Sequence, residues 1–103
     1  MTDESTMTER VHLSDLDSDG RAALFEGEPH TVFLALAAGD EIPPHRHPDR
    51  DVVCHVLDGE LSMRLGEERH DLQAGDVLRF DGDQDISPVA RSDCEAVLVL
   101  ASR

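Results

Sequence analysis

The stretch GDEIPPHRHPDRDVVCHVLDG, residues 39–59, is the most informative part of the sequence about its fold. It opens with a glycine- and proline-rich break and then presents His45 and His47 two positions apart. In an extended chain such positions point to the same side, about 7 Å apart, so both imidazoles can converge on one cation. Residues 52–57 are apolar almost throughout, as expected for a strand covered on both faces. The Asp58-Gly59 pair after them predicts a hairpin turn.

Short strand candidates separated by turn residues continue on both sides of this stretch. We expect strands at residues 10–13, 21–25, 31–37, 52–57, 60–65, 69–72, 77–80, 86–90 and 96–101. A turn is predicted at 17–20, and no segment keeps a helical period of 3.6 residues over three turns. The pattern predicts an all-β sandwich or barrel. We expect one domain, 9–103, after a flexible acidic tail, 1–8.

The charge of the chain excludes several kinds of partner. Its 103 residues include 23 acidic and nine basic ones, the net charge is −14, and every basic residue is arginine. Phosphate would meet a repulsive field, so nucleic acid is excluded. An acidic surface without lysine resembles that of proteins from salt-loving organisms, and we expect a halophilic chain.

Other features of the sequence bear on its compartment. No apolar run reaches the roughly 18 residues of a membrane span, and the acidic N-terminus lacks a basic signal-peptide start, so we expect no membrane partner and a cytoplasmic protein. Cys54 and Cys94 lie far apart and form no CxxC pair. In a protein that is not secreted we expect both to be reduced and buried.

Two segments resemble the signatures of the cupin superfamily. Residues 39–59 resemble the first signature, which has a glycine, five residues, His-x-His, three or four residues, an acid, six residues and a glycine. The segment LQAGDVLRF, residues 72–80, is similar to the strand that opens the second signature. The resemblance spans about residues 30–100. It implies a double-stranded β-helix, a jelly-roll barrel with its site in the mouth or interior.

The resemblance also implies a metal centre, but only two of its ligands, His45 and His47, match directly. Asp51 satisfies the gap after His47, yet seven residues rather than six then precede the closing glycine. Counting back from that glycine places Val52 at the ligand position. In the second signature Asp81, Asp83 and Ile86 stand where a proline, a glycine and a histidine are expected.

Strand parity frames the choice of a third ligand. If the strand is regular, Val52, Cys54 and Val56 share one face, and Asp51, Val53, His55 and Leu57 share the other. The usual register of the family turns the first set inward, and Cys54 is then the nearest alternative ligand. A one-residue bulge near Asp51 would instead bring its carboxylate beside the histidines, and a full slip would add His55. We favour the bulge and predict a site of His45, His47 and Asp51.

The function expected from this site is metal-dependent. A divalent transition metal (Zn, Fe, Mn, Ni or Cu) would leave coordination positions open to a small-molecule ligand, as in dioxygenase- or isomerase-like relatives. The alternative is a metal-free, non-catalytic small-ligand-binding or regulatory module with a vestigial site. Whether the chain is an enzyme stays open. Because small jelly rolls expose sheet edges and one apolar face, we expect a homodimer.

The remaining polar groups are expected to be structural. His12, His30 and His70 lack a partner pattern and are expected to be exposed or hydrogen-bonded. Arg46 and Arg50 are expected to pair with acidic side chains on the surface, although they could pair with an anionic ligand. The carboxylates at 81, 83 and 85 lack the spacing of a calcium loop, and a solvated loop is expected there.

Overall fold

A computed structural model describes residues 8–16 and 20–103 of the chain. Residues 1–7 of the expected tail and the expected turn at 17–19 lie outside the described residues. The elements are η1 (Leu13–Asp15), β1 (Gly20–Ala23), β2 (His30–Leu36), β3 (Arg50–Asp58), β4 (Glu60–Leu65), β5 (Glu68–Gln73), β6 (Val77–Asp81), β7 (Ile86–Ala90) and β8 (Cys94–Ser102).

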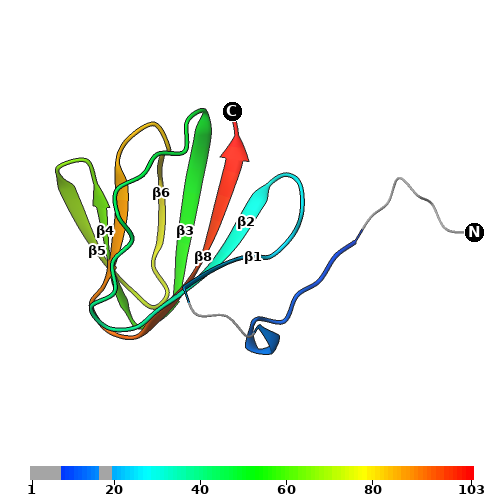
Figure 1. The fold of residues 1–103 in the computed structure, drawn as a ribbon, viewed down its shortest axis with the longest axis horizontal. Coiled ribbons are helices and arrows are strands. Elements are labelled where there is room, and N and C mark those ends of the chain that lie inside the picture. Colours follow the sequence, from blue (N-terminus) through cyan, green and yellow to red (C-terminus); the bar gives the residue numbers. More distant parts are fainter. Residues whose placement is uncertain (1–7, 17–19) are drawn as a thin grey trace, which may run out of the picture.

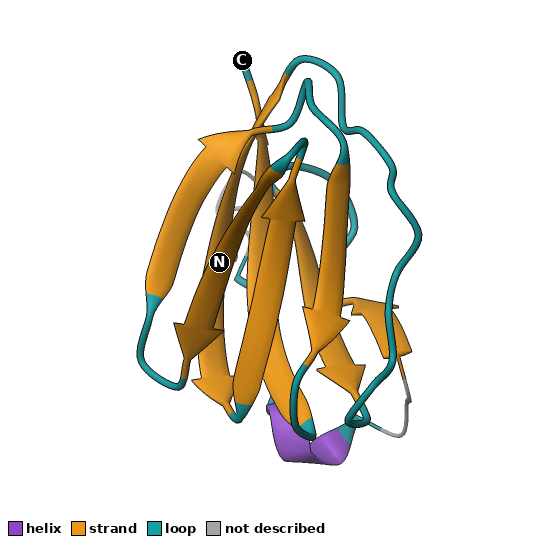
Figure 2. Cartoon of the chain, turned by 90° about the vertical axis from the view of Figure 1, so that its left-hand side faces the viewer, coloured by secondary structure: helices purple, strands orange, loops and turns teal. Residues whose placement is uncertain are grey.

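The strands form two antiparallel sheets. One has five strands in the order β1-β2-β8-β3-β6, and the other has three in the order β5-β4-β7. Figure 1 shows them fanned around a common interior, and Figure 2 shows the strands running up and down with the connections at both ends. The expected all-β jelly-roll barrel is confirmed. None of the helices in the described ranges has the length and hydropathy to cross a membrane.

Eight of the nine expected strands are present, and the one expected at 10–13 is wrong. That region instead leads into the single turn η1. The side chain of His12 caps this turn, because its Nδ1 accepts the backbone N–H of Ser14 at 3.3 Å and lies 2.7 Å from the Ser14 hydroxyl. Such local bonds offer the backbone an alternative to strand pairing.

The core fills the space between the two sheets. Strand β3 shows how it is built: Val52, Cys54 and Val56 are at most 1% exposed, whereas His55 between them is exposed. This period of two is what a strand with one face on a core requires. The turn into β4 needs Gly59, which has φ +77°, and a Cβ there would lie 2.9 Å from the Cα of Cys94.

Part of the outer face of the five-stranded sheet is also apolar. Val53 pairs with Val99, and His55 lies between Val77 and Val97, so these side chains share the face that points away from the core. Val77 is 62% exposed. The face therefore resembles the apolar surface on which the expectation of a homodimer rests, and that expectation stays a prediction.

Candidate functional site

The segment that carries the two histidines runs along the edge of β7. The N–H of His45 donates to the carbonyl of Ile86 at 3.1 Å, and the N–H of Ile86 donates back to His45 at 2.8 Å. Ile42 donates to Pro88, and the hydroxyl of Ser87 donates to the carbonyl of Ile42 at 2.7 Å. These bonds hold the segment extended, as the sequence predicts, so that positions two apart face the same side.

His47 is held by a second contact, with the loop after β6. Its N–H donates to the carbonyl of Gly82 at 2.8 Å, and the N–H of Gly82 donates to Arg50 at 2.8 Å. A Cβ at position 82 would collide with the carbonyl oxygen of His47 and lie 2.8 Å from that of Arg50. Glycine is therefore required here for close backbone approach.

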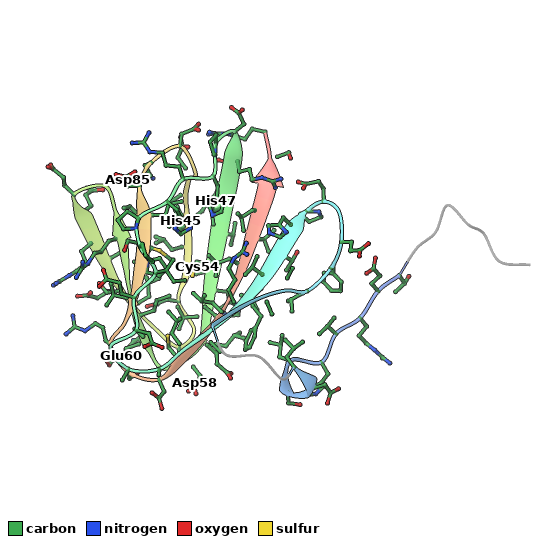
Figure 3. The ribbon with its side chains drawn as sticks, in the orientation of Figure 1. His45, His47, Cys54, Asp58, Glu60 and Asp85 are labelled. Atoms are coloured by element: carbon green, nitrogen blue, oxygen red, sulfur yellow. The ribbon has the colours of Figure 1, made fainter. Side chains whose placement is uncertain are left out.

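The two rings meet at the mouth of the barrel. Their centroids are 4.8 Å apart and their planes are nearly perpendicular, at 87°. Nδ1 of His45 lies 3.0 Å from the carbonyl oxygen of Pro43. Because a carbonyl only accepts, Nδ1 carries the proton, and Nε2 of the neutral ring keeps its lone pair. Figure 3 shows both rings toward one end of the barrel and Asp58 toward the other.

Both histidines line a small cavity. Its volume is about 50 Å³, and its walls are mostly aliphatic. The lining residues are Arg21, Val32, Leu34, Ile42, His45, His47, Leu98 and Leu100. Among the described residues, the polar side chains on this wall are thus one guanidinium and two imidazoles.

The electrostatic surroundings of His47 are positive. The pKa of His47 lies below its ordinary value, first because burial disfavours the charged ring. Coulombic interactions with His45, Arg21, Arg50 and His30 lower it further, in that order. Neutral His47 is therefore favoured near pH 7.

Two members of this cluster, Arg21 and His30, were not expected from the sequence. Arg21 pairs with Leu34 and His30 pairs with Leu100, so both lie on the inner face of the sheet at its rim. Nε2 of His30 lies 3.2 Å from a guanidinium nitrogen of Arg21. The signal for His30 was available, because it has the same parity as Val32 on its strand.

Asp51 is placed away from the histidine pair, and the expected bulge beside it is wrong. Strand β3 keeps an unbroken register with β6 and β8 from residue 51 to residue 55, and its irregularity lies between Val56 and Asp58. Asp51 therefore has the parity of the outer face. Its carboxylate lies 3.5 Å from both Arg79 and Arg103, which satisfies its charge there.

The other candidates for a third ligand also lie apart from the pair. The usual register holds, so Cys54 points inward, but it belongs to the apolar core. Burial raises the pKa of its thiol to about 12, which opposes the thiolate that a metal requires. His55 is exposed on the outer face. Val52 and Ile86, at the positions where the resemblance expects ligands, are at most 2% exposed.

The described residues do not fit a complete metal centre. Within residues 8–16 and 20–103, no group of three His, Cys, Asp or Glu side chains is placed to hold one ion. Metal sites usually have three or four protein ligands. His45 and His47 provide two, and the positive charge of Arg21 beside them opposes a cation. We therefore derive no chemistry through a metal.

The carboxylates of the acidic loop at 81–85 form ion pairs with arginine side chains. Arg103 contacts the carboxylates of Asp81 and Asp83, and Arg46 contacts that of Asp85 at 2.9 Å. Arg50 donates through both terminal nitrogens to Glu28, at 2.9 and 3.0 Å. Arg46 and Arg50 thus form ion pairs with acidic side chains, as expected.

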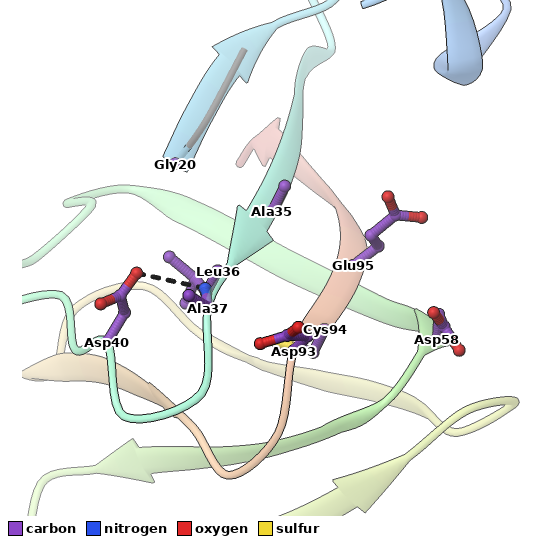
Figure 4. Close-up of a pocket in the computed structure, with 9 residues that line it drawn as sticks. All are labelled: Gly20, Ala35, Leu36, Ala37, Asp40, Asp58, Asp93, Cys94 and Glu95. Atoms are coloured by element: carbon purple, nitrogen blue, oxygen red, sulfur yellow. Dashed lines mark hydrogen bonds between the residues drawn. The ribbon is translucent and has the colours of Figure 1, made fainter.

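An open depression of about 440 Å³ lies at the other end of the barrel (Figure 4). Asp40, Asp58, Asp93 and Glu95 make it acidic. Two of these carboxylates serve the loop itself: Asp40 accepts the N–H of Ala37 at 3.1 Å, and Asp93 accepts that of Ala38 at 2.9 Å. We assign no site to it.

Comparisons with known proteins agree with this architecture. The family described as Cupin domain matches residues 32–101. No curated protein matches the chain. Among solved structures, an RmlC-like cupin protein from Desulfovibrio desulfuricans is 22% identical, with a TM-score of 0.78, over 93% of this chain and 97% of that one.

Two other solved structures are similar in fold. KdgF from Halomonas sp. is 21% identical, with a TM-score of 0.70, over 81% of this chain and 77% of its own. A predicted oxalate decarboxylase from Thermotoga maritima is 21% identical, with a TM-score of 0.72, over 81% and 79%. At these identities the likeness concerns the fold alone. With the family match covering most of its length, the chain belongs to the cupin family.

Proposed function

We propose that this cupin binds a small molecule at the mouth of its barrel, with His45 and His47 as the groups that contact it, and without a complete metal centre. The observation that carries the proposal is the pair itself, fixed by backbone bonds beside a cavity with otherwise largely aliphatic walls. Few polar groups in an apolar pocket are typical of small-molecule sites. His45 offers a ligand the acceptor Nε2, because its N–H is used by Pro43, and a neutral His47 offers one donor and one acceptor.

The charges around the pair support binding without a metal. A divalent cation between the two rings would lie near the guanidinium of Arg21, with no carboxylate placed among the described residues to complete its ligand set. Two imidazoles alone leave at least two positions of a tetrahedral ion unfilled. A neutral or anionic ligand meets no such cost.

The experiment that tests the proposal compares the chain before and after metal removal. Protein purified without an affinity tag is assayed for bound metal, and its thermal midpoint is measured with and without 1,10-phenanthroline. We expect no stoichiometric metal. A metal bound to the folded state would raise the thermal midpoint, and a chelator would then lower it, so we also expect the chelator to leave the midpoint unchanged.

Variants then locate the site. A library of small polar molecules is tested for ligands that raise the thermal midpoint, and these are tested again on His47→Ala. The matched control is His55→Ala, which removes an exposed imidazole from the outer face. Loss of stabilisation in His47→Ala but not in His55→Ala is expected. Equal stabilisation in both variants would contradict the proposal.

The second candidate is a divalent transition metal held by the two histidines alone, with an oxygenated ligand completing its coordination. It is favoured by the bond from Nδ1 of His45 to Pro43, because metal-bound histidines usually donate their other ring N–H to such an acceptor. Dioxygenase- or isomerase-like chemistry belongs to this candidate only. A chelator-sensitive midpoint that becomes insensitive in His45→Ala would establish it and refute the first.

A further inference from the structure

We infer that the ligand of this pocket is a small carboxylate anion, bound by the guanidinium of Arg21 together with the imidazole of His47; the inference rests on the proposed function. Arg21 and His47 line the same cavity. A guanidinium presents N–H donors in a fork that matches the two oxygens of a carboxylate. A neutral imidazole adds one further N–H.

His30 acts as a positioning residue for Arg21. A guanidinium only donates, so the 3.2 Å contact makes Nε2 of His30 the acceptor. The strand register places both residues on the inner face of the sheet. A long side chain on an edge strand is thereby directed over the cavity, which lowers the entropy lost when a ligand binds.

The local charge at the mouth is opposite in sign to that of the whole chain. The chain carries −14, yet the charged side chain on the wall of the cavity is the guanidinium of Arg21, and Arg50 also acts on His47. The carboxylate of Glu28 lies at this rim, but it accepts from both terminal nitrogens of Arg50 and from the hydroxyl of Ser102. Glu28 therefore neutralises the charge of Arg50, and the guanidinium of Arg21 stays available to a ligand in the cavity.

Salt screens the distant acidic surface, so the charge near the cavity dominates the affinity for an anion. The Debye length is about 8 Å at physiological ionic strength and about 3 Å at 1 M salt, so the distant acidic surface is largely screened. A carboxylate in direct contact with Arg21 is screened much less. The acidic surface then slows the approach of an anion more than it weakens the bound state.

The size of the cavity limits the ligand. At about 50 Å³ the cavity is far smaller than the roughly 300–1,000 Å³ of pockets that enclose drug-sized ligands, so it takes one small group such as a carboxylate. Any larger part of the ligand would lie outside, toward the open mouth. Acetate and oxalate are therefore suitable probes, with acetamide and oxamide as uncharged analogues of similar shape.

The test uses the metal-depleted full chain, with ionic strength matched by KCl. Binding of the four probes is measured by calorimetry and by thermal shift on wild type, Arg21→Gln and the control Arg79→Gln, which removes a guanidinium from the outer face. We expect the carboxylates to bind and the amides to fail. Arg21→Gln should weaken carboxylate binding about tenfold or more, and Arg79→Gln should leave it unchanged.

The outcomes separate this inference from the proposed function. If the amides bind as tightly as the carboxylates, and binding is lost in His47→Ala but kept in Arg21→Gln, the pocket is a ligand site but not an anion site. If Arg79→Gln weakens carboxylate binding as much as Arg21→Gln does, the effect is general surface charge and the inference is wrong. If no probe binds and the screen of polar molecules also fails, the proposed function is wrong as well.

Discussion

The backbone N–H of His47 donates to the carbonyl of Gly82 at 2.8 Å, and a Cβ atom on Gly82 would collide with the carbonyl oxygen of His47. The loop after β6 thus fixes one of the two site histidines through backbone contact alone. No side chain at position 82 fits without movement of the segment that carries His47.

Gly82→Ala is expected to destabilise the fold by about 1–3 kcal/mol, because the added methyl group must displace backbone rather than a flexible side chain. It should also shift the ring resonances of His47 in the NMR spectrum. The control is Gly66→Ala, where a Cβ meets no atom within 4 Å but φ is +61°. That variant should lower the thermal midpoint and leave His47 unchanged. Unshifted His47 resonances in Gly82→Ala would contradict the prediction.

Asp51→Asn is expected to leave ligand binding at the mouth unchanged. Its carboxylate faces Arg79 and Arg103 across exposed surface, so the substitution should cost less than about 1 kcal/mol of stability. Denaturant unfolding and ligand titration on the same preparation check both parts. A loss of binding comparable to that of His47→Ala would mean that the carboxylate reaches the pocket.

Cys54 is expected to be inert in the folded protein. Its thiol is fully buried, and burial raises its pKa to about 12, so the reactive thiolate is strongly disfavoured at pH 8. A thiol reagent should react slowly with native protein and rapidly after unfolding. Cys54→Ser should destabilise the fold by about 1–3 kcal/mol, since it buries a hydroxyl in an apolar core. Rapid native labelling of Cys54, identified by mass spectrometry, would contradict the assignment.

The stability of the fold is expected to fall below about pH 4.5 through Glu28. Its pKa is lowered in the folded state, first by its hydrogen bonds from Arg50 and then by that from Ser102. The folded state therefore binds fewer protons than the unfolded chain in this range, and its stability is present above the unfolded pKa and lost as pH falls through the folded one. Glu28→Gln should reduce the acid sensitivity, most clearly at low salt. An unchanged pH profile in this variant would show that the pair contributes nothing.

A homodimer is expected through the outer face of the five-stranded sheet. On a chain of net charge −14, an apolar face is where two copies approach with the least repulsion, and a symmetric contact matches it to itself. Val77→Asp should shift the molar mass measured by light scattering toward the monomer at high salt, whereas Arg64→Gln, on the other sheet, should not. A monomeric wild type at high salt would contradict the prediction.

Most of the fold could be predicted from the sequence. Turn residues bound the strands closely enough that two of them, β4 and β7, begin and end where expected. Parity grouped the residues of β3 into two faces, and the resemblance to cupins predicted which of the two faces inward. The prediction of a strand at 10–13 was wrong because a pattern of apolar residues gives no information about local hydrogen bonds such as those between His12 and Ser14.

The candidate site was less predictable. The sequence identified His45 and His47, but the bulge that would place Asp51 beside them as the third ligand was wrongly predicted. Spacing alone does not show where a strand has a bulge. Two ladders of backbone hydrogen bonds decide this, and they place the irregularity near residue 57. Arg21 and His30 come from strands distant in sequence, and only the pairing of β1 with β2, and of β2 with β8, brings them to the mouth.

The all-β class, the positions of most strands and the extended His45–His47 step follow from the order of residues alone, because turn chemistry and a period of two are local properties of the chain. The groups that share the mouth of the barrel with His45 and His47 depend instead on how the strands pair. Contacts between strands far apart in sequence depend on register across the whole sheet, and those contacts placed a guanidinium beside the histidines and a carboxylate on the opposite face.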